Sequence, residues 1–176
     1  ADLEEGQEWT GWHRIEKDLW PPKDGYTAMS QADRVKYADL LVADTKILYD
    51  RTRSMTFTPD QLSNGAKELL DEVATGKVTG EEEAWSHTDL WDFQANVDGA
   101  RVAYEDLQPL LATRDKDLDE TLKTRFADLQ TLLDSHRKGD GFVLYTELSQ
   151  DEVKKLSDSV NALSEPLSQL TDKVVG

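Results

Sequence analysis

The apolar residues of this chain recur at alternating steps of three and four positions, which is the repeat of one face of an α-helix. The longest stripe lies within residues 86–113 and consists of Leu90, Phe93, Val97, Ala100, Tyr104, Leu107 and Leu111. The C-terminal segment repeats the pattern with Val153, Leu156, Val160, Leu163, Leu167, Leu170 and Val174. Helices with such a stripe are stable when the stripe is buried against other helices. The sequence therefore predicts an all-α fold, an antiparallel bundle of about six helices.

Three further segments show the same repeat. We expect helices over residues 30–53, over residues 58–76 and around the stripe of residues 118–133. The apolar run at residues 142–145 is too short to define a sheet. The breaks between helices are short, and none is long or polar enough to be an interdomain linker. Residues 1–176 are therefore expected to form a single helical domain.

Several residues mark the expected helix ends. Thr58 is a natural N-cap because Pro59 follows it at the first helical position. Ser149 is a second N-cap, with a glutamate three residues later at the spacing of a capping box. Ser86 is expected to cap the helix over residues 86–113, and Pro166 is expected to bend the last helix.

Composition narrows the classes of function. The chain has no cysteine, which excludes disulfides, thiolate metal sites, iron–sulfur clusters and a cysteine nucleophile. It has 20 Lys and Arg against 36 Asp and Glu, a formal net charge of −16. Nucleic acids and anionic membranes need a cationic face, so this charge argues against both and favours cationic partners such as metal ions.

The apolar runs and the N-terminal sequence indicate whether the chain carries a membrane-spanning or signal segment. No run approaches the roughly 18 apolar residues that a transmembrane helix needs. The N-terminal sequence ADLEEGQEW lacks the basic and apolar regions of a signal peptide, and it lacks an initiating methionine. We therefore expect a mature, cleaved or trimmed chain.

The segment 8–20, EWTGWHRIEKDLW, carries the most chemistry. One broad arc of this helix contains Trp9, Trp12, His13, Glu16, Leu19 and Trp20. His13 and Glu16 are three residues apart, so an imidazole nitrogen and a carboxylate can converge on one ion. An ionised carboxylate on an apolar face is costly unless a cation or a donor compensates it. This pair is our first candidate metal site.

The pair can also be satisfied without a metal ion, in two ways. His13 and Glu16 can simply hydrogen-bond to each other, or Glu16 can pair with an Arg or Lys from another helix. Zinc proteases use His-Glu-x-x-His or His-x-x-Glu-His, and Lys17 follows Glu16 here, so the protease pattern fails. The sequence also contains no nucleophile–base pair at a recognisable spacing.

Three weaker candidates lie elsewhere. The first comprises His87, Asp89 and Asp92, which can equally be polar residues of a helix start. The second is the helix face of Asn64, Glu68 and Glu72, which points away from the apolar stripe of its helix. The third is the triplet 81–83, three glutamates that form a solvated acidic loop or bind hard cations weakly.

The motif Gly11-Trp12-His13-Arg14-Ile15-Glu16 resembles the imelysin-like family, whose hallmark is Gly-x-His-x-x-Glu. Four blocks in the same order resemble its EfeO/EfeM-type branch: EEGQEWTGWHRIEKDLW, LSNGAKELLDEVATGKVTGEEE, SHTDLWDFQANVDGA and KGDGFVLY. The resemblance implies an all-helical, non-enzymatic iron-binding protein, periplasmic or held on the cell surface as a lipoprotein. It also implies a membrane iron permease and a haem peroxidase as partners.

The resemblance also implies a set of metal ligands and further helices at the N-terminus of the domain. It places His13 and Glu16 at the metal, with Glu68 as a third ligand, and assigns no role to His87, Asp89 or Asp92. Iron, as Fe2+ or Fe3+, is the expected metal, and the ligand set also suits zinc or copper. Family domains have further helices before the motif, so N-terminal helices are expected to be missing here or supplied by a separate chain. The alternative function is a non-enzymatic helical module that binds a protein or a metal-bridged polysaccharide, with His13 and Glu16 paired to side chains.

Overall fold

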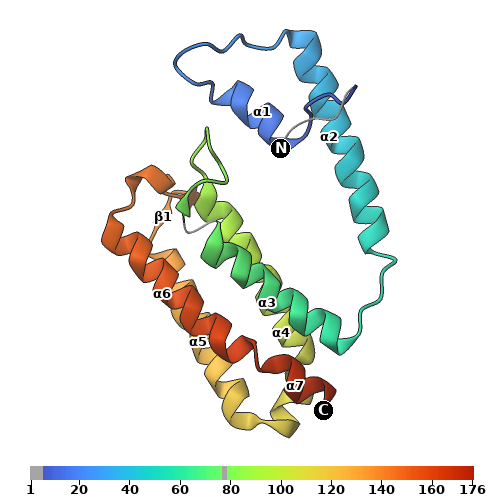
Figure 1. The fold of residues 1–176 in the computed structure, drawn as a ribbon, viewed down its shortest axis with the longest axis vertical. Coiled ribbons are helices and arrows are strands. Elements are labelled where there is room, and N and C mark those ends of the chain that lie inside the picture. The colour runs from blue at the N-terminus through green and yellow to red at the C-terminus, as the bar shows by residue number, and fades with distance from the viewer. Residues whose placement is uncertain (1–5, 77–78) are drawn as a thin grey trace. The chain divides into compact units, whose positions relative to one another are not determined.

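The computed structural model describes residues 6–76 and 79–176, which fall into two compact units (Figure 1). The N-terminal unit runs through Thr56 and also includes Glu83–Ser86. The C-terminal unit comprises Phe57–Glu82 and His87–Gly176. Apart from one short hairpin, the regular elements of the described residues are helical. The predicted all-α fold class is confirmed.

The N-terminal unit is built from two helices, α1 (Trp12–Leu19) and α2 (Gln31–Thr52), which pack on each other. Gly11 precedes α1 with φ 90°, a left-handed conformation that favours glycine. Ser30 caps α2, because its hydroxyl oxygen accepts the Asp33 N–H at 3.1 Å. The helix expected over residues 30–53 is therefore confirmed.

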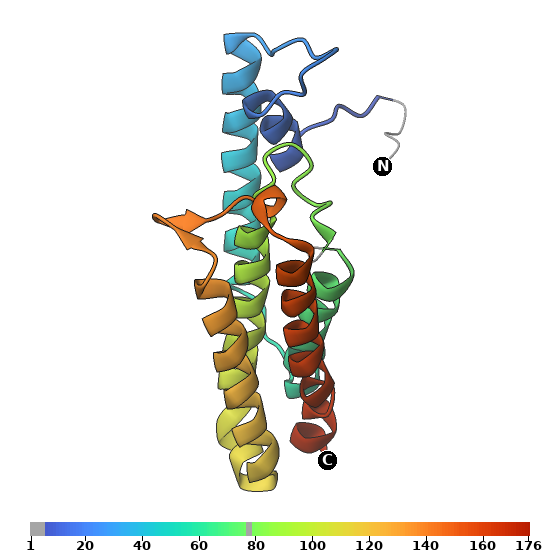
Figure 2. The same cartoon turned by 90° about the vertical axis from the view of Figure 1, so that its left-hand side faces the viewer.

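The C-terminal unit is a helical bundle. Its helices are α3 (Pro59–Thr75), α4 (Asp89–Arg114), α5 (Lys116–Asp134), α6 (Gln150–Leu167) and α7 (Leu170–Val175). The four long helices lie side by side, and α7 packs against α3 and α4 at one end (Figures 1 and 2). Only Asp115 separates α4 from α5, so the chain reverses direction there.

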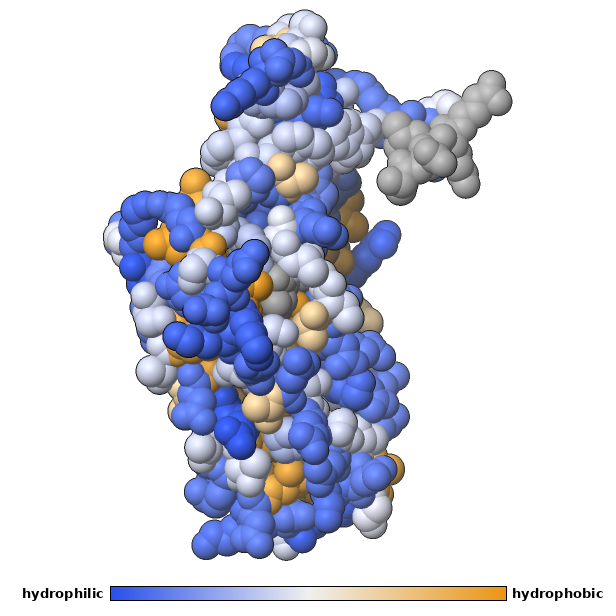
Figure 3. All heavy atoms as spheres, turned by 60° about the vertical axis from the view of Figure 1, so that its left-hand side comes forward, coloured by the Kyte–Doolittle hydropathy of each residue, from blue (hydrophilic) through white to orange (hydrophobic). Residues whose placement is uncertain are grey.

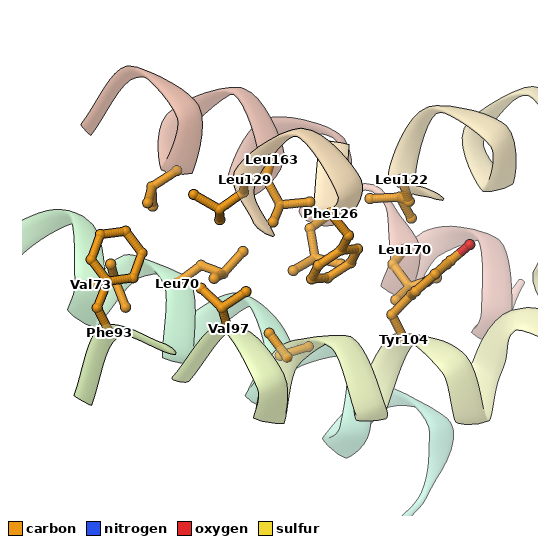
Figure 4. Packing of buried hydrophobic residues seen from close by; sticks show 14 of the residues in the cluster. Leu70, Val73, Phe93, Val97, Tyr104, Leu122, Phe126, Leu129, Leu163 and Leu170 are labelled. Carbon is orange, nitrogen blue, oxygen red and sulfur yellow. The ribbon is translucent and has the colours of Figure 1, made fainter. Parts of the chain in front are cut away.

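The apolar stripes predicted from the sequence form the core of this bundle (Figure 4). Its fully buried large side chains are Leu70, Val73, Leu90, Phe93, Leu111, Leu122, Leu129, Leu133, Leu156, Leu163, Leu167 and Leu170. Every long helix of the unit contributes to this set. Burial of this continuous apolar cluster is the main source of the unit's stability.

The predicted helix starts are correct in two cases and wrong in one. Pro59 begins α3, and the Thr58 N–H donates to Gln61 at 3.0 Å. Ser149 caps α6 in a capping box. Ser86, in contrast, does not cap α4, which begins at Asp89 after Thr88. The Ser86 hydroxyl instead donates to Glu16 at 2.9 Å, so the serine serves another contact.

Two breaks expected from the sequence, at Pro166 and around Gly139, are also breaks between elements of the structure. Helix α6 ends at Leu167, one residue after Pro166. Strands β1 (Arg137–Lys138) and β2 (Gly141–Phe142) pair in antiparallel orientation. The tight turn between them contains Gly139, whose φ is 61°. The 3-10 helix η2 (Tyr145–Glu147) follows β2.

The surface is predominantly hydrophilic. The face seen in Figure 3 is mostly hydrophilic, with apolar patches between hydrophilic residues. Within the described residues, no helix is both long and apolar enough to cross a bilayer.

Candidate metal centre

Three acidic or imidazole side chains converge in the N-terminal unit. They are His13 and Glu16 from α1 and Glu83 from the segment Glu83–Ser86. Each offers one possible ligand atom, and these atoms all lie within 4.8 Å of one another. Among the residues that the structure describes, this is the one group of three or more such side chains close enough to hold a metal ion.

Glu16 is the centre of the group and is buried, with 6% of its surface exposed. Its Oε1 accepts the backbone N–H groups of Trp85 at 3.0 Å and Ser86 at 2.8 Å, as well as the Ser86 hydroxyl at 2.9 Å. Its Oε2 lies 3.1 Å from Nδ1 of His13. One oxygen therefore anchors the segment Glu83–Ser86, while the other faces the imidazole.

The environment keeps Glu16 ionised. Burial raises the pKa of Glu16, but hydrogen bonds from the Ser86 backbone, His13, the Trp85 backbone and the Ser86 hydroxyl lower it by more, so the net pKa is below its ordinary value. A buried carboxylate that remains charged is a strong acceptor and a competent metal ligand. Its negative charge also favours a cation beside His13.

His13 and Glu83 give the group access to solvent. The His13 side chain is 47% exposed, and Glu83 is half-buried. Oε2 of Glu83 lies 3.4 Å from the Ser86 hydroxyl, which bonds more closely to Glu16. Two carboxylates and one imidazole are thus held together where a solvated ion can reach them.

The sequence prediction that His13 and Glu16 lie away from solvent among three tryptophans is right for Glu16 and wrong for His13. Trp12 is 68% exposed and Trp20 is 49% exposed, while Trp9 is half-buried against Trp85. The physical reason is that α1 is only eight residues long and is anchored through its carboxylates rather than through an apolar stripe.

Asp18 is the second of these anchors, and no sequence pattern singled it out. Its side chain is buried and accepts the Tyr26 hydroxyl and the Met29 N–H, both at 2.8 Å, and Nε of Arg34 at 2.7 Å. These bonds tie α1 to the start of α2 and to the loop between them. Asp18 thereby helps to fix the helix that carries His13 and Glu16.

The sequence-predicted hydrogen bond between His13 and Glu16 is present, and so is a cluster of ligand atoms that could hold an ion. That bond occupies one oxygen of Glu16 but does not explain why Glu83 lies beside the pair. In the sequence, Glu83 is part of a triplet expected to form a solvated acidic loop or to bind hard cations weakly. No pattern in the sequence pairs Glu83 with α1, because the segment is brought there by the bonds of the Ser86 N–H and hydroxyl to Glu16.

The remaining candidates lie in the C-terminal unit. Glu68 is an exposed residue of α3, on a groove with Leu69 and Glu72, and its role as a third ligand stays a prediction. Asp89 is buried in the first turn of α4 and accepts the Glu82 N–H at 3.2 Å, which fits the alternative of a helix-start residue. His87 precedes that helix with φ 57°, and Asp92 lies in its first turn.

Comparison with known proteins gives a consistent result. The model of the imelysin family, which also carries a peptidase label, matches residues 1–170. An Efem/EfeO family lipoprotein of Staphylococcus haemolyticus is 40% identical over 173 residues, covering 97% of this chain and 58% of the relative. One from Staphylococcus aureus strain NCTC 8325 is 39% identical over 176 residues, covering 97% of this chain and 60% of the relative. The chain thus spans somewhat under two thirds of these relatives' length, and it belongs to the imelysin family as a protein of the EfeO/EfeM type.

Proposed function

We propose that this protein is an extracytoplasmic iron-binding component of a bacterial iron-uptake system, which captures the ion through His13, Glu16 and Glu83. The observation that carries the proposal is the convergence of these three side chains within 4.8 Å around a buried, ionised carboxylate. The Efem/EfeO lipoprotein relatives support the placement in iron uptake and outside the cytoplasm.

The ligand chemistry supports a hard or borderline metal ion. Carboxylate oxygens suit ferric and ferrous iron, and one imidazole also accepts zinc and copper. The net charge of −16 raises the local concentration of cations around the protein. A site with three protein ligands leaves coordination positions for water, which favours reversible loading over permanent retention of the ion.

The proposal includes delivery. An ion held by half-exposed ligands can be passed on, and we propose a membrane iron permease as the recipient and a haem peroxidase as a further partner of the same system. The lipoprotein relatives support attachment at a membrane surface, where such a transfer takes place. We propose no catalytic step, in keeping with relatives that are named as lipoproteins and with the missing zinc-protease pattern.

Metal titration with matched variants tests the site. We expect Zn2+ or Fe2+ to raise the melting temperature of the unaltered protein, and we expect His13→Ala and Glu83→Gln each to weaken binding by about 10-fold or more in calorimetric titration. Glu81→Gln is the matched control, because it removes the same charge from an exposed residue of the same triplet. An unchanged affinity in both site variants would refute the site.

The same titration separates the two candidates for the third ligand. Glu83 is supported by its distance to the pair, and Glu68 by the family resemblance. If Glu68→Gln weakens binding while Glu83→Gln does not, the resemblance-based assignment is right and the geometric one is wrong. If Glu83→Gln alone weakens binding, Glu83 is the third ligand.

A second function is favoured by one specific observation, the bond between His13 and Glu16 together with the three donors on the other oxygen of Glu16. These contacts satisfy the carboxylate without any ion. The alternative is a non-enzymatic helical module that binds a protein or a metal-bridged polysaccharide. It predicts that His13→Ala leaves any melting-temperature shift with iron, zinc or copper unchanged.

A further inference from the structure

The ammonium group of Lys17 lies among aromatic rings of the N-terminal unit. Its Nζ is 5.1 Å from the ring centre of Trp85, 5.5 Å from that of Trp9 and 5.9 Å from that of Tyr26. The rings of Trp9 and Trp85 also contact each other, with centroids 5.9 Å apart and planes at 52°. The cation of Lys17 therefore lies near three aromatic rings, and one of them, Trp85, belongs to the segment Glu83–Ser86 of the candidate metal centre.

This arrangement, which we call the tryptophan–lysine clamp (Trp9, Lys17 and Trp85), contacts the segment that carries Glu83. Trp85 is two residues after Glu83, and Lys17 is the residue after Glu16. The backbone of the segment is bound by Glu16 through the N–H groups of residues 85 and 86. The clamp adds a side-chain contact on the same short segment, through a cation lying over a ring and through a ring pair.

We infer that the tryptophan–lysine clamp positions Glu83 as a metal ligand, so that Lys17, Trp9 and Trp85 set the affinity of the site without touching the ion. This inference rests on the proposed metal-binding function. A glutamate on a loop binds an ion weakly when the loop must be ordered in the same step, and a pre-ordered loop removes that cost.

The charge of Lys17 allows positioning to be distinguished from simple electrostatics by the sign of the effect on affinity. A positive charge near a cation site opposes binding by simple electrostatics, so its removal by Lys17→Met should tighten binding if electrostatics were the whole effect. Positioning predicts the opposite sign, because Lys17→Met retains an unbranched chain but loses the attraction to the rings. We expect Lys17→Met to weaken Zn2+ binding and Lys17→Arg to retain it.

The closing experiment is a double-mutant cycle measured by Zn2+ calorimetry on the full 176-residue chain, with the melting temperature and far-UV circular dichroism recorded for each variant. The variants are Trp85→Leu, Glu83→Gln and the two together. Trp85→Phe is the conservative rescue, and Trp20→Leu is the control, a 49%-exposed tryptophan at the C-terminal end of α1. We expect Trp85→Leu to weaken binding about 10-fold in the presence of Glu83 and to have no further effect once Glu83 is replaced.

The outcomes separate this inference from the proposed function. If the unaltered protein binds no Zn2+, both are overturned. If Glu83→Gln weakens binding but Trp85→Leu and Lys17→Met do not, the site stands and the clamp inference falls. Additive effects of Trp85→Leu and Glu83→Gln also overturn it, since a merely structural role lowers affinity whichever residue is at position 83. Should Trp85→Leu fail to fold, the sign of the Lys17→Met effect decides alone.

Discussion

In the C-terminal unit the buried side chains are mostly apolar and come mainly from five helices, whereas the buried residues of the described part of the N-terminal unit are Glu16, Asp18, Tyr37 and Ser86. One unit is thus held by a continuous hydrophobic cluster and the other by hydrogen-bonded carboxylates. Apolar burial is non-directional and scales with area, while a buried carboxylate requires particular donors at particular distances. The fold of the N-terminal unit therefore depends on a few particular hydrogen bonds, and the loss of one of them should disrupt it more easily.

The helices of the N-terminal unit leave more large apolar side chains exposed than the helices of the C-terminal bundle do. On α2, Val42 is 69% exposed, Leu48 62% and Tyr49 56%. Between α1 and α2 lies an apolar groove lined by Trp12, Ile15, Ala38, Leu41, Val42 and Tyr49. The candidate metal centre lies in this unit rather than in the well-packed bundle. Regions of lower local stability are where ligand-dependent ordering has most effect.

The largest expected effect is a core truncation in the C-terminal unit. Phe93→Ala removes a fully buried ring and should lower the free energy of unfolding by about 3–5 kcal/mol. Leu48→Ala on exposed α2 is the counterpart and should change it by less than about 0.5 kcal/mol. Urea unfolding of both variants checks the contrast. Similar losses would show that α2 is buried in the folded protein and that the comparison is wrong.

The next effect concerns the anchor of the N-terminal unit. Glu16→Ala leaves the N–H groups of Trp85 and Ser86 without their acceptor, at a cost of about 1–3 kcal/mol per buried unsatisfied group. Hydrogen exchange should therefore become faster at these two amides and on α1, while the amides of α4 and α5 keep their protection. Loss of protection throughout the bundle would show that the units do not open separately.

The bundle could be predicted from the sequence because its signal is local and periodic. The stripe from Leu90 to Leu111 specifies both a helix and the face that it buries. The N-cap positions of Thr58, before a proline, and of Ser149, three residues before a glutamate, are also local patterns, and both were predicted correctly.

The candidate metal centre could be predicted only in part. His13 and Glu16 share a helix, so their proximity follows from the helical repeat. Glu83 reaches them through contacts 69 and 70 positions apart, between Glu16 and residues 85 and 86, and no periodic pattern encodes such a pairing. Ser86 shows the difficulty, because the same residue type that caps helices here binds a distant carboxylate.

A smaller effect is expected in the pH dependence of the two buried aspartates. The pKa of Asp18 is lowered first by the Met29 N–H, and then by Tyr26 and Arg34. In the C-terminal unit burial raises the pKa of Asp119, but Lys123, Tyr104 and Gln108 lower it by more, so its net pKa is also lowered. Each stabilises the protein above the ordinary pKa of about 3.9, and this stabilisation is lost as the pH falls through the lowered value of the folded state.

Melting curves of Asp18→Asn and Asp119→Asn between about pH 6 and pH 2 test this sign. We expect each variant to melt below the unaltered protein at about pH 6, with the difference shrinking at about pH 2. The Asp18 variant should affect mainly a signal from the N-terminal unit, such as the fluorescence of Trp9 and Trp12. A difference that grows on acidification would mean that the folded-state pKa values are raised.

The smallest effect compares the caps of one helix in each unit. Ser149→Ala removes the acceptor of the Glu152 N–H at 3.3 Å, and Ser30→Ala removes the acceptor of the Asp33 N–H at 3.1 Å. Each loss is worth about 1 kcal/mol in a helix that unfolds with the rest of its unit. Because α6 belongs to the cooperative bundle, Ser149→Ala should lower the urea midpoint of the whole protein. Helix α2 has one buried residue, so Ser30→Ala should appear only as faster amide exchange in its first turn. An equal shift of the urea midpoint by both variants would mean that the two units unfold as one.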